Sequence, residues 1–233
     1  MSRGVSRGIL VTGASRGIGR AIVKAFEELG DRVFAHSTAR ADLRDPDAAR
    51  LLVEEAVAEL GAIDVLVNNA GVYIEHPLAE VSYADWQAAW RETFEVNVFG
   101  AANVSYCAAR HMISSEVRGR IINVGSRGAY RGEPHHPAYG ASKAALHSFG
   151  QSLAVYLAPH GIGVASVAPG FIMTERQADL INGAQGEAIR LQSPFSRVGT
   201  PEEVAQAVIY LASGAAIWAS GTVLDLNGAS YLH

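Results

Sequence analysis

The sequence lacks several features that would tie the protein to a membrane or to an oxidising compartment. It has one cysteine, Cys107, so no disulfide can form within the chain, and we interpret this residue as a small buried apolar side chain. No apolar run approaches the roughly 18 residues of a membrane helix. No signal peptide precedes the first apolar run, which begins at residue 8. We therefore expect a cytoplasmic protein.

The chain also lacks an excess of positive charge. It has 19 Lys and Arg residues against 23 Asp and Glu, a formal net charge of −4, so we expect no nucleic-acid partner. Arg3 and Arg7 form the only basic cluster near an end, and we interpret them as a solvated tail. His135 and His136 have no partner at metal-ligand spacing, so we expect no metal; an exposed loop is our interpretation, and substrate contact the alternative.

What the chain does have is a regular alternation of two patterns over 233 residues. Short, almost continuously apolar runs suit strands covered on both faces, and amphipathic segments lie between them. This alternation predicts one α/β domain, residues 1–233, built as a Rossmann-like doubly wound parallel sheet. The apolar runs are 8–13, 32–36, 64–71, 119–126, 162–170 and 222–228, and the helical patterns are 17–29, 46–60, 83–113, 139–158 and 201–213.

Residues 172–197 break this alternation. The segment mixes helical pattern with Gly183, Gly186 and Pro194, and it follows the end of a predicted strand, where ligands bind in such sheets. We interpret it as a mobile lid over a substrate; an ordinary pair of surface helices is the alternative.

A glycine-rich turn, Gly13-Ala14-Ser15-Arg16-Gly17-Ile18-Gly19, joins the first predicted strand to the first helix. Glycines permit a tight turn and close approach of the backbone to a pyrophosphate. The helix that follows directs its N–H groups and the positive end of its dipole at that anion. The spacing differs from the commoner Gly-x-Gly-x-x-Gly fingerprint, and a purely structural turn is the alternative.

Tyr139 and Lys143 are four residues apart, which places both on one face of a predicted helix. An ammonium beside a phenol favours the phenolate, and such tuning lets a tyrosine transfer a proton near neutral pH. Ser126 ends a predicted strand, where its hydroxyl can bond a substrate oxygen. Asn97 lies inside a predicted helix, where asparagine is disfavoured, so it indicates a local irregularity. Each residue taken alone is also compatible with chance.

Together these motifs resemble the NAD(P)-dependent short-chain dehydrogenase/reductase family over residues 8–227. They are TGASRGIG, NNAG at 68–71, Asn97, Ser126, YGASK and PGFIMT at 169–174, in the family's order. The resemblance implies that Tyr139 is the acid or base, that Ser126 polarises the substrate carbonyl, that Lys143 holds the nicotinamide ribose and that Asn97 positions a proton-relaying water. It also implies cofactor contacts from Asn69, Ala70, Gly71, Pro169, Gly170, Ile172 and Thr174.

The chain looks most similar to the 3-oxoacyl-acyl-carrier-protein reductases within that family. This similarity implies reduction of a ketone, with an acyl thioester among the candidate substrates, and a homo-oligomer, tetramer or dimer, built on the helices that carry Asn97 and Tyr139. An NAD-linked dehydrogenase of a secondary alcohol is one alternative. A dinucleotide-binding sensor without turnover is another, although such relatives commonly lose the Tyr or the Lys.

The stretch from Ser37 to Asp42 departs from the family pattern. Ser37 stands where NAD-dependent members carry an acid, so Ser37, Thr38, Arg16 and Arg40 favour the 2′-phosphate of NADP(H). Asp42 and Leu43 resemble the pair that contacts adenine. Four residues between Ser37 and Asp42 are too few for a parallel crossover. We therefore predict that one helix and the edge strand are missing, which leaves about six strands and a more open adenosine end.

Overall fold

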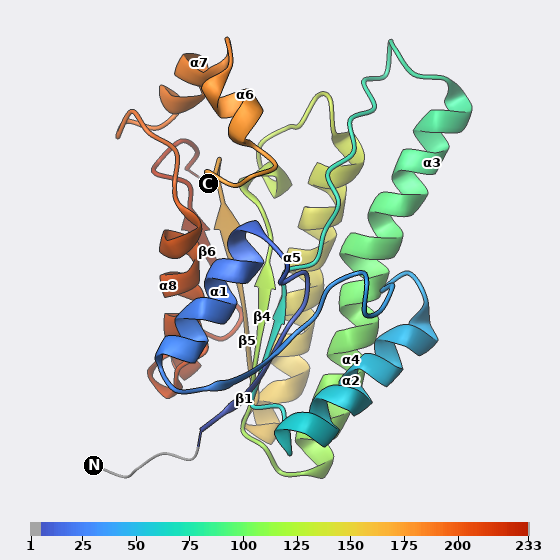
Figure 1. The fold of residues 1–233 in the computed structure, drawn as a ribbon, viewed down its shortest axis with the longest axis vertical. Helices are drawn as coiled ribbons and strands as arrows, with labels where there is room; N and C mark the ends of the chain where they lie inside the picture. The colour runs from blue at the N-terminus through green and yellow to red at the C-terminus, as the bar shows by residue number, and fades with distance from the viewer. Residues whose placement is uncertain (1–5, 233) are drawn as a thin grey trace.

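A six-stranded parallel sheet in the order β2-β1-β3-β4-β5-β6 forms the centre of the computed structural model, which describes residues 6–232 (Figure 1). Every neighbouring pair runs parallel, as the continuous apolar runs predict. The strands are β1 (Gly8–Val11), β2 (Arg32–Ala35), β3 (Val65–Asn68), β4 (Arg120–Val124), β5 (Gly163–Pro169) and β6 (Val223–Leu226).

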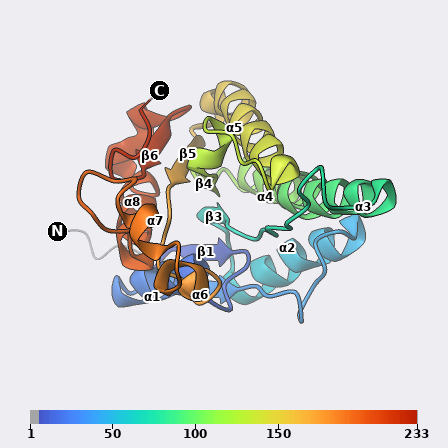
Figure 2. The same cartoon turned by 90° about the horizontal axis from the view of Figure 1, so that it is seen from above.

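Helices cover both faces of this sheet (Figures 1 and 2). On one face, α1 (Gly17–Glu28) packs against α8 (Pro201–Leu211) over a core that includes Phe26 and Ile122. On the other, α2 (Pro46–Leu60), α4 (Ala101–Ser114) and α5 (Pro137–Leu157) bury Phe34 and Met112. The predicted doubly wound α/β domain is thus confirmed as the fold.

The chain between β2 and α2 is a short loop, which confirms the predicted loss of one helix and one strand. Asp45 ends the loop, because its carboxylate accepts the N–H of Asp47 while Pro46 occupies the first turn of α2. The helix then crosses over β1 to reach β3, so β2 is the outermost strand. Arg40 turns from the glycine turn toward α2, pairing with Glu55 at 3.1 Å, and so departs from its predicted phosphate role.

The predicted helix 83–113 is interrupted, as Asn97 indicates. α3 (Tyr83–Phe94) and α4 are joined by a π-helical turn, Glu95–Gly100, that contains the buried Asn97. Such a turn inserts one extra residue and redirects the side chains beyond it. Here it turns the Asn97 amide toward the chain after β3, where it accepts the N–H of Val72 at 2.8 Å.

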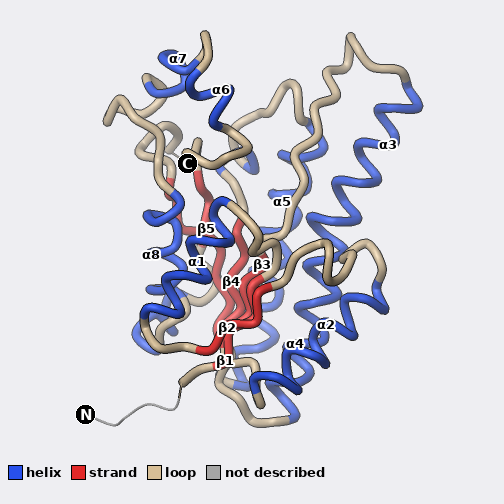
Figure 3. Tube along the Cα trace, viewed as in Figure 1, coloured by secondary structure: helices blue, strands red, loops and turns tan. Residues whose placement is uncertain are grey.

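Residues 172–197 lie over the carboxyl ends of the strands (Figures 1 and 3). Two one-turn helices, α6 (Ala178–Asn182) and α7 (Gly186–Arg190), are connected by loops. Arg131 bonds Gln192 at 2.7 Å and so fastens this segment to the chain after β4. The position is the one that we predicted for a lid; its movement stays a prediction.

The N-terminal segment differs from our expectation. Arg3 lies outside the described residues, but Arg7 pairs with Asp31 at 2.5 Å and donates to the carbonyl of Ala212, so it is not a solvated tail. Within residues 6–232, no helix is both long and apolar enough to cross a membrane.

Candidate active site

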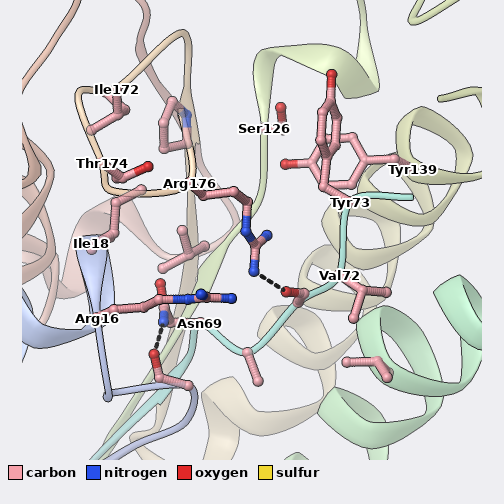
Figure 4. Close-up of a pocket in the computed structure, with 18 of the residues that line it drawn as sticks. Arg16, Ile18, Asn69, Val72, Tyr73, Ser126, Tyr139, Ile172, Thr174 and Arg176 are labelled. Atoms are coloured by element: carbon pink, nitrogen blue, oxygen red, sulfur yellow. Dashed lines mark hydrogen bonds between the residues drawn. The ribbon is translucent and has the colours of Figure 1, made fainter. Parts of the chain in front are cut away.

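A cavity of about 410 Å³ opens at the carboxyl ends of β1, β3, β4 and β5. It brings together segments far apart in the sequence, including the glycine turn and the N-terminal part of α5 (Figure 4). Most residues predicted to contact cofactor or substrate line it: Gly13, Ser15, Arg16, Gly17, Ile18, Gly19, Thr38, Asp42, Leu43, Asn69, Ala70, Gly71, Ser126, Tyr139, Lys143, Pro169, Gly170, Ile172 and Thr174.

Three predicted residues, Ser37, Arg40 and Asn97, are not among those that line the cavity. The carbonyl of Ser37 accepts the N–H of Arg40 at 2.9 Å to close a turn. Asn97 lies behind Gly71: a Cβ on that glycine would come within 3.2 Å of Asn97 Oδ1 and 3.6 Å of Lys143 Nζ. The Asn97 amide also donates to Val72 O at 3.1 Å and to Ser142 Oγ at 3.0 Å.

The glycine turn passes too close to β3 and its own helix for side chains. A Cβ on Gly13 would lie 2.7 Å from Ala70 Cα, at a positive φ of 65°, and one on Gly19 would lie 2.2 Å from the Gly13 carbonyl. Asn69 holds the turn by donating its amide to Gly13 O at 2.9 Å. Asn69 thus shapes the site through the backbone that it fixes.

His36 is a second support of this turn that our sequence analysis missed. Its buried ring accepts the N–H of Gly13 at Nδ1, 3.2 Å away, and pairs Nε2 with the carbonyl of Ala41 at 2.9 Å. This arrangement requires the neutral Nε2–H tautomer, and burial lowers the pKa of His36. The one sequence feature that indicates this role is the position of His36 directly after β2, at the start of the loop that is shorter than in the family.

The N-terminus of α1 fits a pyrophosphate. No side chain caps this helix end at Arg16, and the first turn carries no acid. The carboxylate of Glu175, from the lid, accepts the N–H of Gly17 at 3.0 Å and pairs with Arg20. A carboxylate therefore stands where the exposed N–H groups and helix dipole favour an anion.

Tyr139, from α5, and Ser126, from the end of β4, lie next to each other in the cavity wall (Figure 4). Burial raises the pKa of Tyr139, and the hydrogen bond with Ser126 opposes this shift. From the sequence we expected Lys143 to lower this pKa, but its Nζ lies 5.6 Å from the centre of the Tyr139 ring and donates to Val124 O at 2.8 Å. The expectation is wrong because burial is the largest cause of the shift and the cation that opposes it is Arg176, so the phenol keeps its proton at neutral pH.

Lys143 is buried with no carboxylate partner among residues 6–232. Burial, with Arg176 as a second cause, lowers the pKa of its ammonium to about 8. Because this pKa is close to neutral pH, an anion placed beside Lys143 would change the protonation of its ammonium.

At the opposite end of the cavity, Asp42 and Leu43 line the wall as predicted. Asp42 is paired with Arg44 at 2.5 Å, and these hydrogen bonds lower the pKa of the Asp42 carboxyl. Arg44 also lines the cavity and brings a cation that the sequence analysis did not assign.

Several further residues that sequence reasoning missed line the other end of the cavity. Tyr73, Arg127 and Glu133 surround the Ser126–Tyr139 pair, and Arg176 reaches in from the lid toward Gly71 O at 3.3 Å (Figure 4). The Tyr73 hydroxyl bonds Glu133, and burial raises the pKa of that carboxyl. These residues sit in loops between motifs, where neither periodicity nor spacing indicates a direction.

His135 and His136 do not line the cavity. His135 is exposed near Glu75, and His136 stacks on Tyr73 with ring centres 3.6 Å apart. Cys107 is half-buried on α4, outside the site, and burial raises the pKa of its thiol. Within the described chain there is no cluster of three His, Cys, Asp or Glu side chains suited to a metal.

Comparison with known proteins identifies the family. The profile of a family described as enoyl-(acyl carrier protein) reductase matches residues 35–228. The 3-oxoacyl-[acyl-carrier-protein] reductase FabG of Vibrio cholerae is 33% identical, with 96% of each chain covered. The chain belongs to the short-chain dehydrogenase/reductase family. It is accordingly an NAD(P)-dependent oxidoreductase that acts on CH–OH groups.

Other relatives within this family differ in substrate. The L-rhamnose 1-dehydrogenase (NAD(P)(+)) of Sphingomonas sp. (strain SKA58) is also 33% identical, covering 97% of this chain and 96% of its own. Among solved structures, ElxO with NADP bound superposes with a TM-score of 0.87 at 26% identity, covering 97% of this chain and 99% of its own. The aldohexose dehydrogenase of Thermoplasma acidophilum has a TM-score of 0.83 at 32% identity, covering 96% and 93%. Similarity alone therefore spans acyl and sugar substrates.

Proposed function

We propose that the protein is an NADP(H)-dependent carbonyl reductase in which Tyr139 is the general acid. The observation that carries this proposal is the meeting of Ser126, Tyr139 and Lys143 in the same cavity as the glycine turn. A raised pKa for Tyr139 supports reduction, because the protonated phenol is the form that donates to a carbonyl oxygen.

In this proposal each residue has a separate task. Ser126 donates to the substrate oxygen and holds it against the Tyr139 phenol. Lys143 binds the ribose hydroxyls, and a developing phenolate at Tyr139 is stabilised by its nearby charge. Asn97 fixes Val72 and Ser142 beside Lys143, consistent with a water relay at that point. The dinucleotide, held at the N-terminus of α1, supplies the hydride.

The preference for NADP(H) over NAD(H) rests on the wall near β2. Thr38 and Arg16 line the cavity there, and among the described residues that wall offers no acid where NAD-dependent relatives carry one. Arg44 adds a cation to the same end, although its pairing with Asp42 reduces the net charge. Neither Ser37 nor Arg40 contributes, so the preference depends on fewer groups than the sequence suggested.

One assay tests the proposal. The purified protein is mixed with NADPH or NADH and a panel of acetoacetyl thioesters, simple ketones, diketones and sugars, and loss of reduced-cofactor absorbance is followed. We expect turnover of at least one carbonyl compound, with a lower KM for NADPH than for NADH. Tight dinucleotide binding without any turnover would support the sensor alternative, and a preference for NADH would overturn the cofactor assignment. Oxidation of sugars with no carbonyl reduction would support the alcohol dehydrogenase alternative.

A homo-oligomer is the second part of the proposal. The outer surface of α4 and α5 carries exposed apolar side chains, among them Tyr106, Val155 and Tyr156. Large side chains of this kind gathered on neighbouring helices support burial against another copy of the chain. Self-association through the exposed side chains of α4 and α5 would leave the cavity at the carboxyl ends of the strands open.

A further inference from the structure

Arg127 is a buried cation beside the reacting groups to which the proposed reduction assigns no task. It follows Ser126 directly, and only 5% of its surface is exposed. Arg127 lines both the catalytic cavity and a second cavity of about 400 Å³ beneath the lid. Arg127 is therefore placed between the reacting centre and the space into which the rest of a substrate can extend.

Within residues 6–232, the guanidinium of this residue makes a single hydrogen bond. One nitrogen of Arg127 donates to the Ser230 hydroxyl at 2.6 Å, and the Phe171 ring centre lies 5.4 Å from the guanidinium carbon. Among residues 6–232, no carboxylate lies within 4 Å of it. A guanidinium has five N–H donors in a rigid fork that matches a carboxylate, so the donors of Arg127 that do not bond Ser230 can receive a ligand.

The charges around Arg127 suit a singly charged ligand. Burial lowers its pKa, Arg131 acts in the same direction, and Glu133 opposes them. The sum over these three side chains is one positive charge. Asp225 lines the second cavity but not the catalytic cavity that Arg127 shares with Ser126 and Tyr139; after burial, its charge is the second cause of the raised pKa of Tyr130. An anion brought to Arg127 would thus offset the desolvation of a charge that has no ion pair among residues 6–232.

The geometry points to Arg127 as a subsite for a substrate carboxylate, which makes the natural substrate an oxo acid or the corresponding hydroxy acid. The carboxylate receives the open N–H donors of Arg127 while the oxo group lies at Ser126 and Tyr139. This inference rests on the proposed reductase function and narrows it, because a neutral ester or thioester offers the guanidinium no charge.

Matched pairs of acid and neutral compounds test the inference. In the presence of NADPH, acetoacetate and 2-oxobutanoate are compared with their methyl esters as substrates. In the presence of NADP⁺, butanoate and butanamide are compared as ligands by calorimetry, which requires no turnover. For the wild-type protein we expect kcat/KM to favour the acids and butanoate to bind more tightly than the amide.

Three variants separate the subsite from a structural role. Arg127→Met should weaken butanoate binding and raise KM for the acids about 10- to 100-fold, the range for losing a hydrogen-bonded charge, and leave the neutral compounds within about 2-fold. Arg127→Lys should restore part of the preference. Arg118→Met is the control, because Arg118 is exposed just before β4, at the end of the strand away from the site, and lines neither cavity. Thermal melting and NADPH affinity verify that each variant is folded.

The outcomes are distinct. Equal handling of acids and esters by the wild-type protein, or an equal loss on both in Arg127→Met, would overturn the inference and leave the reductase proposal intact. If Arg127→Met does not fold but Arg127→Lys does, the wild-type comparison of acids with esters and the kinetics of Arg127→Lys decide the question. Selective butanoate binding without reduction of any carbonyl would contradict the proposed function and retain the carboxylate subsite.

Discussion

At the scale of single residues, the protein combines groups whose protonation is set by burial. Burial raises the pKa of Tyr139 and lowers the pKa of Lys143 to about 8, since loss of solvent disfavours the charged form of each side chain. Sequence spacing identified this pair, because helix geometry places residues four apart on one face. It did not reveal that burial dominates both pKa values, because burial depends on the segments that cover the helix.

Replacing Tyr139 by Phe tests the acid. The variant removes one hydroxyl from the cavity wall, so we expect kcat to fall about 100-fold or more while the NADPH dissociation constant stays within about 2-fold. Steady-state kinetics and a fluorescence titration measure the two effects. A Tyr139→Phe enzyme with nearly normal kcat would show that another group delivers the proton.

The pKa of Lys143 predicts a distinctive dependence of stability on pH. The folded-state pKa is about 8 against 10.5 for the free side chain, so between these values the unfolded chain holds a proton that the folded protein has released. The contribution of Lys143 to the free energy of unfolding therefore rises with pH across this window, by at most about 3 kcal/mol.

Urea denaturation of the wild type and of Lys143→Met from pH 7.5 to 10.5 measures this contribution. The difference between the two proteins should change by the predicted amount and in that direction, since other groups titrate equally in both. A constant difference would mean that the ammonium is well solvated.

At the scale of elements, the sequence predicted the helices and strands that have a periodic apolar pattern. It did not predict where side chains in the loops point. The run 32–36 became β2, and the pattern 83–113 became α3 and α4 with an irregularity at Asn97. The one-turn helices of the lid could not be located, because a single turn leaves no period to detect. The inward direction of Arg127, Glu133 and Arg176 depends on packing between loops, which no local pattern encodes.

The lid contact at the N-terminus of α1 leads to a prediction about affinity. The Glu175 carboxylate occupies the Gly17 N–H and places a negative charge where a pyrophosphate is expected. We expect Glu175→Gln to tighten NADPH binding about 2- to 5-fold, the effect of removing one charge near a helix end. Glu187→Gln, in the first turn of α7, is the control and should change nothing. Weaker binding by Glu175→Gln would instead indicate that the carboxylate holds the lid over a bound cofactor.

At the scale of the whole molecule, the cavity opens at the carboxyl ends of the strands, and the exposed apolar side chains of α4 and α5, Tyr106, Val155 and Tyr156, do not line it. Self-association can therefore occur without blocking the site. We expect Val155→Glu combined with Tyr156→Glu to shift the protein to a smaller species in light scattering coupled to gel filtration. Leu29→Glu, an equally exposed apolar position at the end of α1, should leave the mass unchanged. A wild-type protein that is monomeric at micromolar concentration would contradict the proposal.

The shortened loop after β2 also changes what the sheet presents at its margin. An unpaired strand margin offers N–H and C=O groups to any extended chain and is a route to aggregation. β2 limits this route: it has four residues, Arg32 bonds the carbonyl of Leu60 at 2.9 Å, and the Arg40 guanidinium covers the Phe34 ring at 3.9 Å. Arg40, which the sequence suggested for phosphate, thus shields an apolar ring at the sheet margin. The shortened loop makes β2 the outermost strand, and Arg32 and Arg40 reduce the ability of this strand to pair with a strand of another molecule.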